Sequence, residues 1–368
     1  MINSSAQEFK TVRDGIEYAE VTRDIAGLNV NMNLLRLDLT KVRLDVHHAM
    51  DAAIGTEKTS SIATRHGAFA AINAGFFRLD TSIWAGDAAG VLQIDHRLLS
   101  ESSNNRTAIF VRNWGSYTEV SFAPIDIGSS FQLGKHDYHF TGVNRQRSDE
   151  DVIEYTPAFG RTTLTGAKGL EFVVSNGKII TINDGQGSTE IPPKGYVISA
   201  SGKYAEELRA LGKIGSKVNS FVYVAHRMGK AFPNVESMRT DSAFSGAEDI
   251  TNGVPQLIKN SKIDITWEQE KSSKSFVETR HPRTAVANLK DGKFLMITVD
   301  GRSEASGGIG LQDLAEYLLS LGATDAMNLD GGGSTTMFVD GKVVNHPSDK
   351  EGERKVSDAI LVTPRKKH

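Results

Sequence analysis

The chain of 368 residues contains no cysteine, has few aromatic residues and has no long apolar run. The absence of cysteine excludes disulfides, thiolate catalysis and zinc–thiolate sites. No apolar stretch approaches the ~20 residues that a membrane-spanning helix needs. Aromatic residues make up 7% of the chain, and its tryptophans Trp84, Trp114 and Trp267 are scattered. The sequence therefore shows no aromatic platform for stacking sugars.

An excess of charge of one sign is also absent. Lys and Arg number 42 against 45 Asp and Glu, a formal net charge of -3. Nucleic acid is excluded as the main partner, because phosphate backbones demand a basic footprint. Residues 1–10 are polar and lack the apolar segment of a signal peptide. A cysteine-free chain suits the periplasm as well as the cytosol, and an exported protein whose signal peptide has been removed would look the same.

The apolar pattern is that of a globular protein rich in strands. Apolar residues alternate with polar ones around residues 30–46, and Asn176-Gly177 marks a hairpin within residues 172–182. Helical periodicity is clearest at residues 311–321, before Gly322. We predict an α+β fold with a mixed or antiparallel β-sheet core and few flanking helices. The expected organisation is a β-rich segment, residues 1–60, packed on a catalytic domain, residues 61–368.

Polar residues gather where four predicted strands meet loops. Asn73 ends the first of these strands and is followed by a glycine turn, which either points its amide into a cleft or lets it bond its own backbone. His281 and Arg283 precede the second strand, and paired Arg280 and Arg283 suit an anion such as phosphate or carboxylate. A solvated basic turn with a structural salt bridge is the alternative.

The other two segments add acids and glycines. Asp300 and Arg302 follow an apolar strand, and the loop then leads to a helix N-terminus that can favour anions. Asp330 enters the run Gly331, Gly332, Gly333, Ser334 and Thr335, where the glycines let the backbone approach a ligand closely. Such a run can form a nest of N–H groups for an anion, or a flexible turn.

These segments, in this order, resemble the phosphodiester glycosidase family. The residues that carry the resemblance are Asn73-Ala74-Gly75-Phe76-Phe77, His281-Pro282-Arg283-Thr284-Ala285, Asp300-Gly301-Arg302 and Asn328-Leu329-Asp330-Gly331-Gly332-Gly333-Ser334, with weaker matches at Tyr155-Thr156-Pro157 and Arg354-Lys355-Val356-Ser357-Asp358. Ala74 stands where relatives usually have glycine. The loop after Arg302 is shorter and carries Glu304, so we expect substrate choice to differ there.

The resemblance implies a secreted, periplasmic or surface hydrolase that cleaves the anomeric bond between a sugar and a phosphodiester, with polysaccharides or similar glycans as substrates. No cofactor is expected. Because phosphate is a weakly basic leaving group, fixed positive charge at Arg283 and Arg302 should stabilise it, helped by N–H groups of residues 331–334. Asp300 and Asp330 are the candidate nucleophile or base, and the sequence does not rank them. Asn73 and His281 would orient the substrate.

Three alternatives remain open at this point. The same acids with Asn328 could hold a divalent cation, since all offer hard oxygen ligands. An ordinary glycosidase could use Glu304 as its acid. A carbohydrate-binding surface protein could use the same cleft without turnover.

Overall fold

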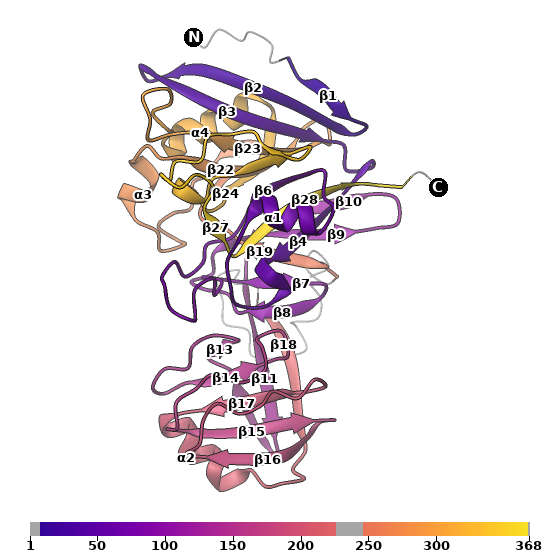
Figure 1. The fold of residues 1–368 in the computed structure, drawn as a ribbon, viewed down its shortest axis with the longest axis vertical. Coiled ribbons are helices and arrows are strands. Elements are labelled where there is room, and N and C mark those ends of the chain that lie inside the picture. Colours follow the sequence, from indigo (N-terminus) through magenta and orange to yellow (C-terminus); the bar gives the residue numbers. More distant parts are fainter. Residues whose placement is uncertain (1–7, 226–245, 367–368) are drawn as a thin grey trace.

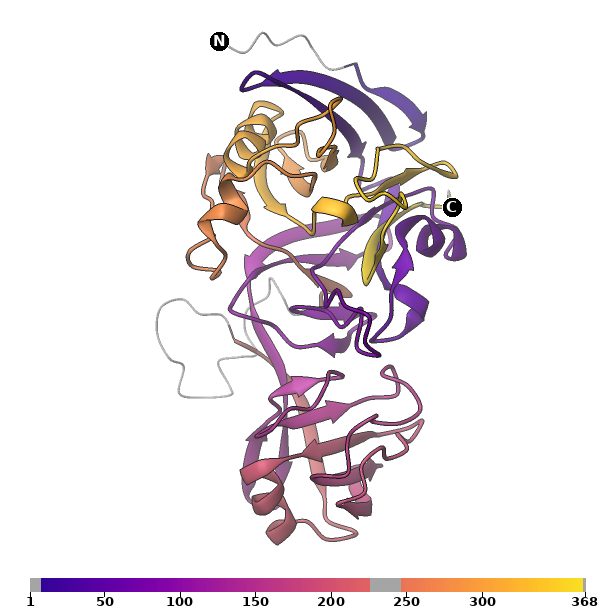
Figure 2. The same cartoon turned by 60° about the vertical axis from the view of Figure 1, so that its left-hand side comes forward.

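The computed structural model describes residues 8–225 and 246–366. Figures 1 and 2 show an elongated molecule with an upper body, which carries the first and last described strands, and a lower lobe formed by residues 126–225. Both parts are built mainly of antiparallel sheets. The described helices are short and few.

The largest sheet has eight strands, all paired antiparallel. Asp291-Gly292, a dipeptide typical of hairpin turns, joins its two central strands. Its strands in spatial order are β1 (Lys10–Arg13), β2 (Ile16–Ile25), β3 (Leu28–Leu37), β23 (Phe294–Val299), β22 (Arg283–Leu289), β24 (Ala323–Asn328), β20 (Gln256–Lys259) and β21 (Lys262–Ile263).

A second antiparallel sheet packs against the first. Its strands in order are β26 (Lys342–Val343), β25 (Met337–Val339), β6 (Ala70–Asn73), β28 (Asp358–Pro364) and β4 (Val42–His48). Between the two sheets lies a core that includes Leu35, Met296, Ile72 and Ile360, all fully buried. Burial of this apolar surface holds the ends of the two sheets at fixed positions relative to each other.

Two smaller sheets complete the upper body. One has the strand order β10 (Thr118–Pro124), β9 (Thr107–Asn113), β19 (Asp249–Asn252), β7 (Leu92–Ile94) and β8 (Arg97–Ser100). The other pairs β5 (Glu57–Lys58) with β27 (Lys355–Val356). Residues 246–275 thus supply β19, β20 and β21 to the sheets of the body.

The lower lobe contains two sheets and a helix. Its strand orders are β12 (His136–His139), β11 (Asp126–Leu133), β18 (Val218–Ala225), and β13 (Gly142–Val143), β14 (Val152–Tyr155), β17 (Tyr196–Ala200), β15 (Leu170–Ser175), β16 (Lys178–Asp184). Helix α2 (Gly202–Leu211) contributes Ala205 and Leu208 to the core of the lobe. Asn176 and Gly177 take the left-handed φ angles of 50° and 67° that a tight hairpin turn requires.

The remaining helices lie in the upper body. They are α1 (Thr59–Arg65), α3 (Lys274–Glu278) and α4 (Leu311–Ser320), with 3-10 turns η1 (Ala49–Asp51) and η3 (Gly332–Ser334). Helix α4 buries Leu311, Leu314 and Leu318 in a core that it shares with the eight-stranded sheet. The helix ends just before Gly322, which has a φ angle of 91°, as the apolar periodicity and this glycine predict.

The predicted fold class holds in its broad form, since antiparallel sheets dominate and helices are few. The described part of the chain is mostly β, so the helical share of an α+β fold is small. The division at residue 60 stays a prediction; strand β3, on its N-terminal side, pairs with β23 of the large sheet. No described helix is long and apolar enough to cross a membrane.

Candidate functional site

Three of the four predicted segments leave adjacent strands at one end of the large sheet. Arg283 begins β22 and lies opposite Val299, the last residue of β23. Ala285, on the same strand, lies opposite Asn328, the last residue of β24. The start of the central strand and the ends of both its neighbours therefore meet at one edge. The loops of residues 281–283, 300–302 and 330–335, which we call the loop cluster, are brought together by this register.

Asn73 ties the second sheet to the loop cluster. It is fully buried at the end of β6, and its Nδ2 donates to the carbonyl of Asp330 at 2.7 Å. Its Oδ1 accepts from the Thr284 hydroxyl at 2.7 Å and from the Thr336 N–H at 3.1 Å. The amide thus bonds neither its own turn nor open solvent, because all its recorded partners belong to β22 and to the chain after β24.

Arg283 is the largest fully buried side chain, with 1% of its surface exposed. Its guanidinium donates to the backbone carbonyls of Phe276 at 2.6 Å, Thr279 at 2.9 Å and Ile309 at 3.3 Å. The ring of Phe276 lies 4.8 Å from its Cζ. Within residues 8–225 and 246–366, no carboxylate forms an ion pair with Arg283. Burial, and then the charge of Arg302, lower the pKa of Arg283 to about 10.

Arg302 carries the second guanidinium and is exposed. Its Nη2 lies 3.5 Å from His281 Nδ1, and its Nη1 donates to the Ser348 hydroxyl at 3.5 Å, both long contacts. It also lacks an ion-pair partner among the residues that the structure describes. Burial, followed by the charges of Arg283 and Arg302, lowers the pKa of His281. The two guanidinium groups thus act on the same imidazole, that of His281.

Four N–H groups of the glycine loop are already bonded within the protein, so these four do not form the open nest that is one of the two alternatives from the sequence. The N–H of Gly331 donates to Asp330 Oδ1 at 2.9 Å, and that of Gly332 to the Pro282 carbonyl at 2.9 Å. Those of Ser334 and Thr335 donate to loop carbonyls. The loop closes on itself as η3, so these donors are already satisfied.

The glycines instead allow guanidinium groups to approach the backbone. A Cβ added at Gly332 would lie 3.0 Å from Arg302 Nη2. A Cβ added at Gly333 would lie 2.2 Å from both Arg354 Nη2 and Asp349 Oδ1. Only glycine leaves room for the charged groups that flank the loop on these two sides.

Asp330 is a half-buried carboxylate at the entrance of the loop. Its Oδ1 accepts from the Gly331 N–H at 2.9 Å, and its Oδ2 has no recorded partner in the described part of the chain. Burial raises its pKa to about 6, against the lowering effects of the nearby Ser334 hydroxyl and the charge of Arg354. The carboxylate combines a shifted pKa with a free oxygen, which is typical of a functional acid or base.

Asp300 has a different environment. Only 3% of it is exposed, and its Oδ1 accepts from His346 N at 3.0 Å and Asn345 Nδ2 at 3.3 Å. Its Oδ2 faces His346 Nδ1 at 3.3 Å, and the imidazole is 85% exposed. Burial raises the pKa of Asp300. Because Asn345 also donates to the Thr335 carbonyl at 3.0 Å, Asp300 is linked to the glycine loop.

Sequence reasoning did not identify Asn345, His346 or Asp349 as parts of this site. Asp349 forms a two-point ion pair with Arg354, at 2.7 and 2.9 Å. His346 lies 46 residues from Asp300 along the chain, so spacing gives no indication of their pairing. The signal that was available is a polar Asn345-His346 pair placed directly after the Asp340-Gly341 hairpin.

Several buried polar atoms around the glycine loop have no hydrogen-bond partner among the residues that the structure describes. They are the hydroxyls of Ser334, Thr335 and Thr336 and the Oδ1 of Asn328. Buried polar groups are nearly always paired with protein, water or ligand. Their concentration here, where the guanidinium groups also lack counter-ions, marks the loop cluster as a place for polar ligand or solvent atoms.

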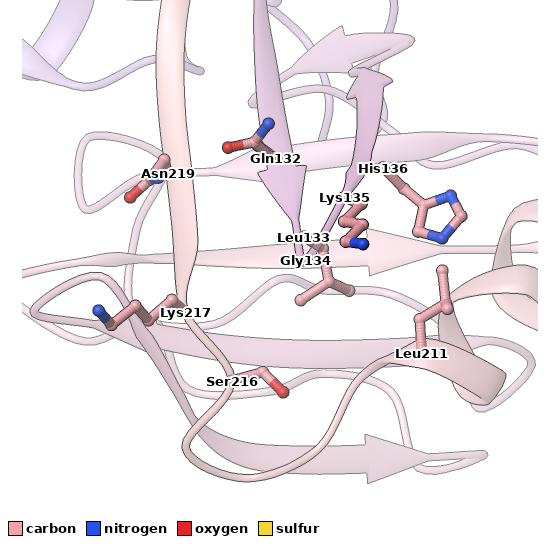
Figure 3. A pocket seen from close by; sticks show the side chains of 9 residues that line it. All are labelled: Gln132, Leu133, Gly134, Lys135, His136, Leu211, Ser216, Lys217 and Asn219. Carbon is pink, nitrogen blue, oxygen red and sulfur yellow. The ribbon is translucent and has the colours of Figure 1, made fainter.

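Two other features do not join this cluster. Glu304 is exposed and has no recorded hydrogen bond or ion pair within the described ranges. A half-open hollow of about 520 Å³ lies in the lower lobe, lined by the β11–β12 turn, the end of α2 and the start of β18 (Figure 3). Its side chains include Lys135, His136 and Lys217, and none of the predicted site residues.

The fold and the loop cluster define a β-rich protein with a candidate anion site at the edge of its largest sheet. The family model for phosphodiester glycosidases matches residues 168–363, just over half of the chain. The chain therefore belongs to the phosphodiester glycosidase family.

A curated relative agrees with this assignment, and two solved structures share the fold. N-acetylglucosamine-1-phosphodiester alpha-N-acetylglucosaminidase of Bos taurus is 28% identical over 186 residues, which are 48% of this chain and 33% of that protein. The match thus spans about a third of that curated relative. A hypothetical protein from Synechocystis superposes with a TM-score of 0.81 at 22% identity, covering 99% of this chain and 64% of that one. A putative exported protein from Burkholderia pseudomallei gives 0.76 at 22% identity, covering 91% and 74%. These two structures show the fold alone.

Proposed function

We propose that the protein is a hydrolase that cleaves the bond between the anomeric carbon of a sugar and a phosphodiester. The observation that carries this proposal is the pair Arg283 and Arg302, two neighbouring guanidinium groups without a carboxylate partner in the described residues. A buried, uncompensated cation is costly unless an anion completes it. Guanidinium groups match the geometry of phosphate oxygens, and membership of the family supplies the substrate class.

The chemistry that this arrangement supports needs little acid catalysis. In the direct route, a water oxygen bonds to the anomeric carbon and gives a proton to a carboxylate base. The bond from that carbon to the phosphate oxygen breaks, and the phosphate departs as a monoester. Positive charge at Arg283 and Arg302 stabilises the charge that develops on the departing oxygen. This role uses fixed groups that are present before the substrate binds.

Asp330 is the better candidate for the carboxylate that faces the anomeric carbon, as nucleophile or as base for water. Its Oδ2 is free of recorded partners, whereas both oxygens of Asp300 are bonded to residues 345 and 346. We assign Asp300 to holding His346 and, through Asn345, the glycine loop. Asp330→Asn should therefore abolish most turnover. Asp300→Asn should lower kcat and also change the pH dependence of kcat.

The other predicted residues support Asp330 and the two arginines, Arg283 and Arg302. Asn73 positions Asp330 through its carbonyl, and His281 contacts Arg302 and faces the substrate phosphate. Gly331, Gly332 and Gly333 keep the loop backbone close to the guanidinium groups. The buried hydroxyls of Ser334 and Thr335, which have no partner among the described residues, would bond substrate or water. We further propose that the substrate is a glycan outside the cytoplasm, in line with the exported-protein description of the Burkholderia neighbour.

A substrate panel tests the proposal. The purified protein is incubated with the methyl phosphodiester of N-acetylglucosamine 1-phosphate, with the same diester of glucose, and with nitrophenyl glycosides. Release of free sugar and methyl phosphate from a diester, with no nitrophenol, is the expected result. Nitrophenol release alone would favour an ordinary glycosidase. Binding of the sugars without turnover of any compound would favour a carbohydrate-binding protein.

A further inference from the structure

Three potential metal ligands meet on the side of the second sheet, in a group separate from the loop cluster. His47 lies near the end of β4, Asp51 ends η1, and His66 directly follows α1. One ligand atom from each lies within 4.8 Å of the other two. In the described residues, the group shares no hydrogen bond or ion pair with Arg283, Arg302 or the glycine loop. It is therefore not used by the proposed reaction.

The geometry of this group is compact. The imidazole rings of His47 and His66 stack with centroids 3.7 Å apart and planes 23° apart. Because each nitrogen lone pair lies in the plane of its ring, one ring must turn out of this stack for both to coordinate one ion. His66 Nε2 lies 2.9 Å from Asp51 Oδ1. The His66 side chain is 24% exposed and that of Asp51 55% exposed, so ions and water reach the group from solvent.

A positive charge already occupies part of this space. Arg65 Nη1 forms an ion pair with Asp51 Oδ2 and lies 3.0 Å from His66 Nε2. One imidazole nitrogen cannot both donate a proton to Asp51 and accept one from Arg65. The two contacts of His66 Nε2 therefore compete. A cation that accepts both the nitrogen lone pair and a carboxylate oxygen removes the conflict.

We propose that His47, Asp51 and His66 bind a divalent transition-metal ion of the zinc class. Two imidazoles and one carboxylate are ligands that Zn²⁺ accepts, with water completing its coordination. When the metal binds, the ion pair of Arg65 with Asp51 breaks. Arg65 keeps its ion pair with Glu57, in which Arg65 Nη2 lies 2.8 Å from Glu57 Oε2. The metal would link β4, η1 and α1, so its role would be to stabilise this part of the fold.

Cobalt and zinc titrations of the whole protein, carrying no histidine tag, test the site. Co²⁺ is followed by its visible absorption and Zn²⁺ by calorimetry. We expect one site per chain, weakened at least tenfold in Asp51→Asn and His66→Ala. His136→Ala, an exposed histidine on β12, serves as the matched control and should bind as the wild type does. Arg65→Gln removes the competing cation and should bind at least tenfold more tightly.

Two outcomes would overturn the proposal. One is the absence of stoichiometric Co²⁺ or Zn²⁺ binding in both the wild type and Arg65→Gln, which would show that the group is an ion pair only. The other is equal binding by the wild type, Asp51→Asn and His66→Ala, which would place the metal elsewhere. Circular dichroism of each variant establishes that the comparison is between folded proteins. Because positions 51 and 66 are partly exposed, substitutions there should leave the fold intact.

Discussion

Arg302→Gln separates ligand binding from folding more cleanly than any other substitution in the loop cluster. The side chain is exposed, and its two hydrogen bonds to described residues are both long, at 3.5 Å. Substitutions at such surface positions usually change stability by no more than about 0.5 kcal/mol. The unfolding free energy of the variant should therefore stay close to that of the wild type.

The expected effect on catalysis is much larger. A hydrogen bond to a charged group contributes about 1.5–3 kcal/mol. If Arg302 stabilises the departing phosphate, its loss should lower kcat/KM on a sugar 1-phosphodiester by a factor of about 10–150, since 1.36 kcal/mol corresponds to tenfold. Arg302→Lys keeps the charge but not the two parallel bonds of a guanidinium, so it should retain part of the activity.

The assay measures kcat/KM for the wild type, Arg302→Gln, Arg302→Lys and a control, Arg280→Gln. Arg280 lies on the same approach to β22, but it bonds the Ile25 carbonyl and pairs with Asp313 at 3.6 Å. The control should keep its activity. NMR titration adds a second readout, because removing the Arg302 charge should raise the pKa of His281. Unchanged kcat/KM in Arg302→Gln would refute the phosphate role.

Three further predictions concern the rest of the cluster. Asn73→Ala leaves three buried partners unpaired and should lower the unfolding free energy by about 2–4 kcal/mol, measured by denaturant titration; a loss below ~0.5 kcal/mol would contradict the bridging role. Gly333→Ala should displace the ion pair of Arg354 with Asp349, lowering the unfolding free energy by about 1–3 kcal/mol and removing most of the activity. Gly115 has open space around it, so Gly115→Ala should change neither the unfolding free energy nor the activity. Because the pKa of Asp330 is raised to about 6, kcat/KM should rise as the pH increases through about 6. The contribution of this carboxyl to the unfolding free energy should decrease as the pH rises from about 4 to 6. A profile of kcat/KM that is flat through this range would exclude Asp330 as the reacting carboxylate.

Local signals in the sequence predicted much of the fold. Helix α4 and its glycine stop follow from the spacing of leucines, and the Asn176-Gly177 hairpin follows from the φ angles that glycine and asparagine tolerate. Residues 246–275 gave no clear pattern, because their strands are short and are completed by partners far along the chain. Strand β19, for example, pairs with β9 and β7.

The candidate site was predictable as a set of segments but not as a set of contacts. Strand ends rich in Arg, Asp and Gly indicated where the polar chemistry would gather. The sequence could not show that the Asn73 amide would bond protein groups on both sides, or that most N–H groups of the glycine loop would already have acceptors within the protein. Both depend on the register between strands, which a single sequence does not contain. The pairing of Asp300 with His346 depends on it in the same way.

The most direct measurement is a crystal structure of the protein soaked with a hexose 1-phosphate. We predict phosphate oxygens within hydrogen-bond distance of the guanidinium groups of Arg283 and Arg302, with the anomeric carbon on the side of Asp330. Density for the sugar phosphate elsewhere, for instance in the hollow of the lower lobe beside Lys135 and Lys217, would contradict the central claim.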